Sequence, residues 1–253
     1  MNWIRGYYRL TLAGLALGFG GTLLVIASWL PIRVGEHHLA LWMLPRIVRL
    51  ILFILSVKVE CPQPEKFRQH RGFVFPNHVS YVDILVLVSV APLRFLAKAE
   101  VRSWPIVGTI ATAIGCVFVQ REDKKSRAEA RNALAKVETF PAVALFPEGK
   151  RGPGDELLPF RYGAFEIVIK GQAAFLPCVI IYDQPKVAIW RRGEHFLKAL
   201  WRLCSFRGPL VARLVALDVV QPSPDDDPAH LAQKTQAGIA AVIEKHRSQR
   251  EAG

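Results

Sequence analysis

Between residues 72 and 181 the chain alternates short apolar runs with segments of helical pattern, and this alternation restricts the fold more than any other feature. The runs of strand type cover 72–76, 93–97, 117–120, 142–146 and 174–181, and the helical patterns between them cover 83–90, 106–114, 126–138 and 163–170. Strands separated by helices of this length are typical of a parallel sheet covered on both faces. We therefore predict an α/β fold, with a mostly parallel mixed sheet flanked by helices, a further strand at 210–220 and a closing helix at 229–246.

The N-terminal part contains a long apolar segment. No charged residue lies between Arg9 and Arg33, and residues 10–30 span about 30 Å as a helix, which is close to the thickness of a hydrocarbon core. A cleaved signal peptide is the alternative interpretation. It is disfavoured because the run is long and no small-x-small site precedes a hydrophilic start.

A second apolar segment, residues 39–57, is interrupted by Pro45, Arg46 and Arg49. Each arginine at the centre of a spanning helix costs about 2.5 to 3.5 kcal/mol, so this segment is expected to lie in the headgroup region or to return the chain. A hairpin also keeps the basic N-terminus and the rest of the chain on one side of the membrane. The sequence thus predicts an N-terminal membrane-associated helical hairpin over residues 1–58, a linker over 59–71, and a second domain over 59–253 that includes this linker.

The composition indicates an anionic partner and a membrane. The formal net charge is +12 and 51% of the residues are hydrophobic, which favours an acidic membrane surface over nucleic acid. The four cysteines are scattered without C-x-x-C spacing, so they indicate neither a zinc site nor a disulfide framework but a reduced, cytoplasmic setting. They are Cys61, Cys116, Cys178 and Cys204.

A polar corner follows the first of the apolar strands in the alternating region. Asn77 and His78 come directly after Pro76, and Asp83 lies near the start of the next helix. Five positions on an ideal helix are separated by roughly 140° around its axis, so we place His78 in the turn and Asp83 on the helix. The carboxylate could then accept a hydrogen bond from one imidazole nitrogen and leave the other as a base, with a substrate hydroxyl as the nucleophile. A helix cap with a surface histidine is the alternative.

Two further polar clusters follow later strands. Arg121 directly follows the strand at 117–120. Its guanidinium group offers a planar fork of donors that suits phosphate. The segment from Phe146 to Gly154 places Glu148, Lys150 and Arg151 among glycines, where the backbone can approach a ligand closely. A solvated arginine and a surface turn are the alternatives for these two clusters.

Together these clusters resemble the blocks of the lysophosphatidic acid acyltransferase family in order and spacing. Lys150 departs from the family pattern because threonine is usual there, and Gly152 stands where serine is common. The matching residues are Asn77, His78 and Asp83 in the first block, Gly115, Phe118 and Arg121 in the second, Phe146, Pro147, Glu148, Gly149 and Arg151 in the third, and Pro177 in the fourth.

The resemblance implies transfer of a fatty acyl group from acyl-CoA or acyl-carrier protein to the free sn-2 hydroxyl of lysophosphatidic acid, which gives phosphatidic acid. His78 would be the general base and Asp83 its orienting partner. No metal or cofactor is implied besides the acyl donor. The expected substrate-binding residues are Asn77, Arg121, Glu148, Gly149, Lys150 and Arg151.

We expect a place at the inner membrane, with the acyltransferase domain of residues 59–253 facing the cytoplasm, because a hairpin keeps the basic segments on the cytoplasmic side. The expected partners are anionic membrane lipids, a lysophospholipid acceptor and acyl-carrier protein, and not nucleic acid. The basic aromatic stretch 190–202 would help the domain to dock on the lipid surface.

Three alternatives remain at this stage. The acceptor could be another lyso-lipid, such as a lyso-ornithine lipid, in which case Arg121 and Lys150 would matter less. A non-catalytic lipid-binding protein would keep the basic surface without needing His78. A metal-dependent phosphoesterase would need more histidine and aspartate ligands near the strand ends than the sequence offers.

Overall fold

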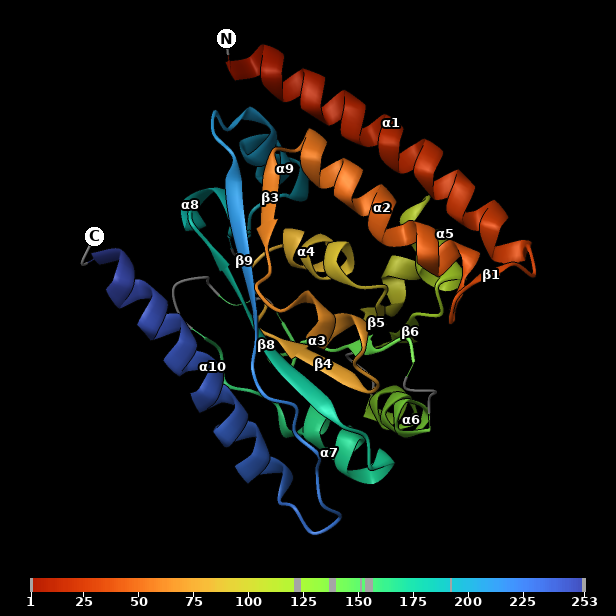
Figure 1. Ribbon diagram of the computed structural model, residues 1–253, viewed down its shortest axis with the longest axis vertical. Helices are drawn as coiled ribbons and strands as arrows, with labels where there is room; N and C mark the ends of the chain where they lie inside the picture. Colours follow the sequence, from red (N-terminus) through yellow and green to blue (C-terminus); the bar gives the residue numbers. More distant parts are fainter. Residues whose placement is uncertain are drawn as a thin grey trace.

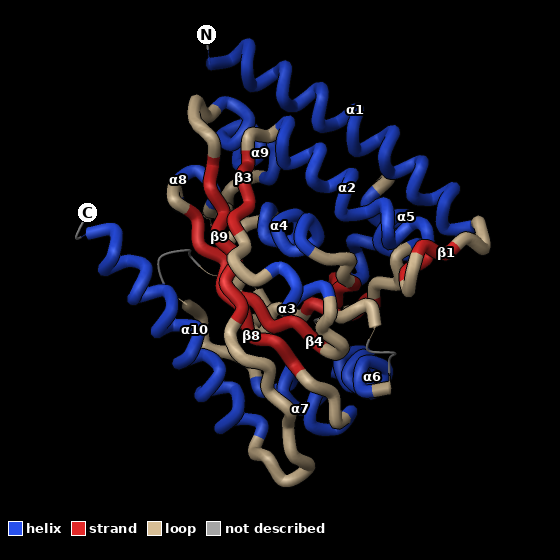
Figure 2. The backbone as a smooth tube through the Cα atoms, viewed as in Figure 1, coloured by secondary structure: helices blue, strands red, loops and turns tan. Residues whose placement is uncertain are grey.

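A seven-stranded sheet forms the centre of the computed structural model, which describes residues 2–120, 124–136, 140–150, 152, 157–191 and 193–251. Its strand order is β3-β9-β8-β4-β7-β5-β6, and Figures 1 and 2 show its part around β3, β9, β8 and β4. Only the β8–β9 pair is antiparallel among these neighbours, so the prediction of a mostly parallel mixed sheet is confirmed. The strands are β3 (Val57–Glu60), β4 (Phe73–Pro76), β5 (Arg94–Lys98), β6 (Val117–Val119), β7 (Val143–Ala144), β8 (Phe175–Tyr182) and β9 (Leu210–Ala216).

Helices cover both faces of this sheet (Figure 1). A short antiparallel pair, β1 (Arg33–Val34) and β2 (His37–His38), connects the first two helices. The helices are α1 (Asn2–Trp29), α2 (Leu39–Ile54), α3 (Pro64–Arg68), α4 (Val82–Val90), α5 (Val107–Ala113), α6 (Lys124–Ala135), α7 (Tyr162–Gly171), α8 (Pro185–Ala188), α9 (Phe196–Ser205) and α10 (Pro228–Glu251), with a 3-10 turn η1 (Ala99–Ser103).

The two faces of the sheet belong to two hydrophobic cores, and β4 shows how the strands divide between them. Phe73 and Phe75 point into the core beneath α7 and α10, whereas Val74 points into the core shared with α1, α2, α4 and α9. Successive side chains of a strand point to opposite faces. All four residues of β4 are buried, which explains why the sequence shows a continuous apolar run here instead of an alternating one.

The prediction of a linker at 59–71 is wrong, because this segment contains the end of β3 and all of α3. β3 pairs in parallel with β9, with Val57 opposite Leu210 and Glu60 opposite Arg213. An edge strand tolerates polar side chains such as Lys58 and Glu60, and Pro64 occupies the start of a helix, where its missing N–H costs nothing. β3 therefore crosses the boundary drawn at residue 58, and the division into two domains stays a prediction.

The helices α1 and α2 lie side by side (Figure 1). Residues Trp3–Trp29 form a helix that is long and apolar enough to cross a membrane. A Cβ atom on Gly20 of α1 would lie 2.6 Å from Ile47 Cγ2 of α2, so glycine permits this close approach. α2 continues through Pro45. Its insertion in a membrane as a hairpin with α1 stays a prediction.

α1 also packs against α9, a helix from the later part of the chain. The rings of Tyr7 and Trp201 meet edge to face with centroids 4.9 Å apart. Arg9 Nη1 donates to the backbone oxygen of Phe206 at 2.8 Å, and Leu24 lies in the same core as Leu203. The apolar N-terminal helix is thus part of the folded domain on one of its sides.

We expect Gly72→Ala to destabilise the protein strongly. Gly72 has φ 145°, and an added Cβ would lie 2.0 Å from the backbone oxygen of Ala174, which accepts from Phe73 N at the start of β4. The loss should be about 3 kcal/mol or more, seen as a lower melting temperature of the detergent-solubilised protein. Gly14→Ala is the matched control because the space around Gly14 is open; equal melting temperatures for the two variants would contradict this expectation.

Candidate active site

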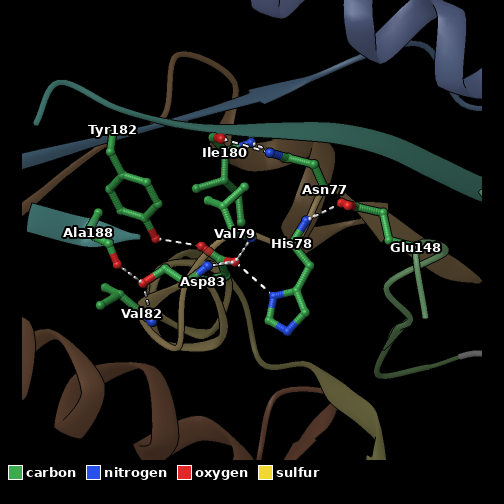
Figure 3. Close-up of polar contacts among 10 residues, drawn as sticks. Asn77, His78, Val79, Val82, Asp83, Glu148, Ile180, Tyr182 and Ala188 are labelled. Atoms are coloured by element: carbon green, nitrogen blue, oxygen red, sulfur yellow. Dashed lines mark hydrogen bonds and ion pairs between the residues drawn. The ribbon is translucent and has the colours of Figure 1, made fainter. Parts of the chain in front are cut away.

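The corner after β4 brings His78 and Asp83 into contact, as the sequence predicts. His78 lies in the turn before α4 and Asp83 is the second residue of that helix. His78 Nδ1 and Asp83 Oδ2 are 2.9 Å apart (Figure 3). The side chain of His78 is 17% exposed and that of Asp83 is fully buried. The imidazole therefore reaches the surface of the site while its partner stays inside.

Asp83 is held by three further hydrogen bonds. Its Oδ2 accepts from the backbone N–H groups of Val79 and Ser80, each at 2.8 Å. Its Oδ1 accepts from the hydroxyl of Tyr182 at 2.6 Å. Burial, together with Asp83 itself, raises the pKa of Tyr182 well above its usual value, so this residue is a neutral donor. The carboxylate is an acceptor in all these contacts, which places a proton on Nδ1 and leaves the lone pair of neutral His78 on Nε2.

The second nitrogen of His78, Nε2, lies on the side of the ring opposite the contact with Asp83 (Figure 3). Phe146 stacks on the imidazole, with ring centroids 3.9 Å apart and an interplanar angle of 25°. Nε2 points away from Asp83 (Figure 3), and no hydrogen bond to it comes from the part of the chain that the structure describes. The stacked ring and the carboxylate together fix the direction in which this nitrogen points.

The third block holds the corner through backbone contacts. Glu148 Oε1 accepts from His78 N at 2.7 Å and Oε2 accepts from Leu158 N at 3.2 Å. Gly152 N donates to the backbone oxygen of His78 at 2.7 Å. Glu148 is 2% exposed, and burial raises its pKa to about 7, although its two backbone hydrogen bonds act in the opposite direction. Its described contacts position His78, and its contact with a substrate stays a prediction.

Asn77 continues the pairing of β4 with β8. Its Nδ2 donates to the backbone oxygen of Ile180 at 3.1 Å, and its Oδ1 accepts from Ile180 N at 2.7 Å. The residue is 3% exposed. These contacts tie the corner to the neighbouring strand, and the expected contact of Asn77 with substrate stays a prediction.

The remaining predicted residues lie around the turn after β7 or outside the described part. Gly149 has φ 70°, a left-handed conformation that favours glycine, and Arg161 covers it closely. Lys150 is exposed beside it. Arg121 and Arg151 lie outside the described residues.

Two features of this site have no signal in the sequence. Tyr182 ends an apolar strand 99 positions from Asp83, and no local pattern marks such a partner. A cavity of about 160 Å³ shares Phe146 with the site. Its lining is mostly apolar and comes from β5, β6, the turn after β7, α6 and α7, including Leu96, Val119, Leu134, Leu145 and Ile167, with Arg131 and Arg161.

Comparison with known proteins gives the class of this α/β protein. Residues 58–181 match the family model described as Acyltransferase. This segment contains His78, Asp83 and the turn that carries Glu148. The protein is therefore an acyltransferase.

Individual relatives narrow the class. A lyso-ornithine lipid O-acyltransferase of Pseudomonas aeruginosa is 30% identical over 90% of this chain and 88% of its own length. A 1-acyl-sn-glycerol-3-phosphate acyltransferase of Neisseria meningitidis is 28% identical over 76% of this chain and 77% of its own length. The crystal structure of the 1-acyl-sn-glycerophosphate acyltransferase of Thermotoga maritima shares the fold, with a TM-score of 0.77 at 21% identity over 97% and 96% of the two chains. The chain belongs to the lysophosphatidic acid acyltransferase family, which confirms the resemblance found in the sequence.

Tyr182→Phe should lower kcat about tenfold with little change in KM. The variant removes one hydrogen bond to Asp83, which is worth about 1.5 kcal/mol and thus roughly one order of magnitude in rate. The loss should appear in kcat because Tyr182 helps to hold the carboxylate that orients His78. Tyr81→Phe is the control, since its hydroxyl donates to Ala199; an unchanged kcat for Tyr182→Phe would exclude a positioning role for Tyr182.

Glu148 should make the protein less stable as the pH rises from about 4.5 to about 7. The folded pKa is about 7 and the ordinary value is 4.5, so in this window the unfolded chain ionises first and the folded state loses stability relative to it. The loss from this residue is at most about 3 kcal/mol. Glu148→Gln cannot ionise, so the difference in unfolding free energy between variant and wild type should change across this window in denaturant titrations. A constant difference would contradict the expectation.

Proposed function

We propose that the protein transfers a fatty acyl group from acyl-CoA or acyl-carrier protein to the sn-2 hydroxyl of lysophosphatidic acid, forming phosphatidic acid. The observation that carries this proposal is the His78–Asp83 hydrogen bond of 2.9 Å, with Nε2 directed away from the carboxylate. This arrangement supplies an oriented base. Family membership supplies the reaction class.

The reaction follows from the roles of the two nitrogens. Nε2 of His78 takes the proton of the acceptor hydroxyl while its oxygen attacks the carbonyl carbon of the thioester. Asp83 holds Nδ1–H and stabilises the imidazolium that forms. The C–S bond then breaks, and the imidazolium returns the proton to the leaving thiolate. The products are the ester and the free thiol, and no acyl-enzyme is needed.

Ser80 does not compete as a nucleophile in this mechanism. It is buried, and its Oγ donates to the backbone oxygen of Ala188 at 2.6 Å and accepts from Val82 N at 3.2 Å. These contacts place its hydroxyl in the support of the corner. The nucleophile is therefore the hydroxyl of the acceptor.

Basic side chains would bind the phosphate of the acceptor. Lys150 is exposed in the turn that carries Glu148, and we assign it this task together with Arg121 and Arg151. Guanidinium groups suit phosphate geometry. Gly149 lets the backbone of this turn approach the ligand.

A lyso-ornithine lipid is the second candidate acceptor. The relative from Pseudomonas aeruginosa with that name matches this chain over 90% of its length, a larger share than the relative from Neisseria meningitidis covers. Lys150 also replaces the usual threonine of the block. Such an acceptor has no phosphate, so its transfer would depend less on Arg121 and Lys150.

We place the enzyme at the inner membrane with its catalytic domain facing the cytoplasm. The length of α1 and its apolar surface support membrane association, and the net charge of +12 supports contact with anionic lipids. A cytoplasmic active site would meet both candidate acyl donors.

The test uses the purified full chain in detergent with labelled acyl-CoA or acyl-carrier protein and a panel of lyso-lipids. Loss of a general base should lower the rate by about two to four orders of magnitude, so His78→Ala should show almost no transfer. His230→Ala is the matched control, because this exposed histidine lies on α10 and should behave as wild type.

The panel also distinguishes the acceptors. Lysophosphatidic acid should give the highest kcat/KM, and Lys150→Ala should reduce transfer to it more than transfer to a lyso-ornithine lipid. Higher kcat/KM for the phosphate-free acceptor would favour the second candidate. Full activity of His78→Ala would exclude the proposed mechanism.

A further inference from the structure

A second basic concavity lies at the far end of α4 from Asp83. It is an open cavity of about 550 Å³ between the C-terminal end of α2, β3, α3 and the C-terminal end of α4, and we call it the basic cavity. It shares no lining residue with the corner that carries His78. The lining residues are Arg49, Leu52, Phe53, Ser56, Val57, Lys58, Val59, Cys61, Pro64, Arg68, Ser89, Val90 and Pro209.

The charged side chains that line this cavity are all cations, although two of them pair with carboxylates outside the lining. Three cations line it, and no aspartate or glutamate is among its described lining residues. Lys58 pairs with Glu60 and Arg68 pairs with Glu65 at the surface. Arg49 has no acidic partner in the part of the chain that the structure describes. A cationic concavity of this kind attracts anions.

Contacts with α4 hold the two arginines close together. Arg49 Nε donates to the backbone oxygen of Ser89 at 2.7 Å, and Arg68 Nε donates to that of Val90 at 3.2 Å. These carbonyls end α4 and carry only about half an elementary charge in total, and Glu65 pairs with Arg68 alone, so the charge of Arg49 is not balanced. Burial, and then the like charges of Arg68 and Arg46, lower the pKa of Arg49. A bound anion would relieve this repulsion.

The rest of the cavity is apolar and continues onto exposed apolar surface. Leu52, Val57 and Val59 form part of its wall. At its rim Phe53 is 80% exposed, and Leu50 on the same helix is 52% exposed. Leu50 and Phe53 are three positions apart and so lie together on one side of α2, and grouped exposed apolar side chains mark a surface for lipid or protein. α2 is also packed beside the apolar helix α1. The combination of paired guanidinium groups and an apolar rim fits an amphipathic anion.

We propose that the basic cavity binds the phosphate group of one anionic phospholipid, with its acyl chains over Leu50 and Phe53. Arg49 donates to the phosphate through its two Nη groups and Arg68 through Nη2, because Arg68 Nη1 already donates to Glu65. Lys58 adds charge at the rim. This site is separate from the site of acyl transfer, and its existence does not depend on that reaction. The ligand is a lipid of the surrounding membrane and is not consumed.

The test titrates the detergent-solubilised full chain with dihexanoyl phosphatidic acid, dihexanoyl phosphatidylcholine and inorganic phosphate. Calorimetry gives the affinity and stoichiometry, and hydrogen exchange reports the region that the ligand protects. Dihexanoyl phosphatidic acid should protect residues 49–61 and 86–91 in the wild type. This first measurement needs no variant, so it does not depend on whether a variant folds.

Arg49→Gln should weaken binding at this site by about tenfold or more, the loss expected for one charge-assisted hydrogen bond. Lys58→Gln should weaken it a few-fold, and it leaves the contacts with α4 intact. Lys234→Gln is the matched control, because it removes the same charge from the exposed face of α10 and should change nothing.

Three results would overturn the proposal. The first is the absence of protection at 49–61 and 86–91 by dihexanoyl phosphatidic acid. The second is equal binding of the zwitterionic lipid, which would remove the role of charge. The third is inorganic phosphate binding as tightly as the lipid, which would make this an anion site without a lipid ligand. Failure here would leave acyl transfer by His78 untouched, because that is measured separately with lyso-lipid acceptors.

Discussion

Four hydrogen bonds to one buried carboxylate organise the site of this protein. Asp83 receives donors from its own turn, from the imidazole of His78 and from Tyr182 on β8. A fully buried carboxylate is costly unless its oxygens are paired, so the loop must close around it in one conformation. The position of the imidazole follows from this closure. The hydrogen bonds to Asp83 thus determine the conformation of the loop, and the loop conformation then determines where His78 lies.

Residues far away in the sequence also hold the corner that carries His78 through hydrogen bonds. Asn77 joins the corner to Ile180 through both atoms of its amide, and Glu148 binds the backbone N–H of His78. Two residues expected from the sequence to face the substrate therefore have described contacts with the backbone. A precise site on loops requires such contacts with rigid elements, and here the sheet provides them.

The sequence predicted the local parts of this arrangement well and the distant parts poorly. The contact between His78 and Asp83 was predictable because five residues of turn and helix determine it. The closing helix expected at 229–246 is also found, as α10 (Pro228–Glu251), and at its start Asp227 Oδ2 accepts from His230 N at 2.8 Å. Tyr182 could not be predicted because its partner comes from another strand. β3 could not be predicted because its pairing with β9 joins segments about 150 residues apart, and prolines follow it closely.

The packing of α1 against α9 has a practical consequence. Leu24 and Ala27 of α1 are buried in the same core as Leu203 and Cys204, and Arg9 caps the end of α9 through Phe206. Deleting the first thirty residues is a common way to obtain a water-soluble form of a membrane enzyme. In this protein such a deletion would uncover apolar side chains of the catalytic half and leave the end of α9 uncapped, so the shortened enzyme would aggregate instead of dissolving.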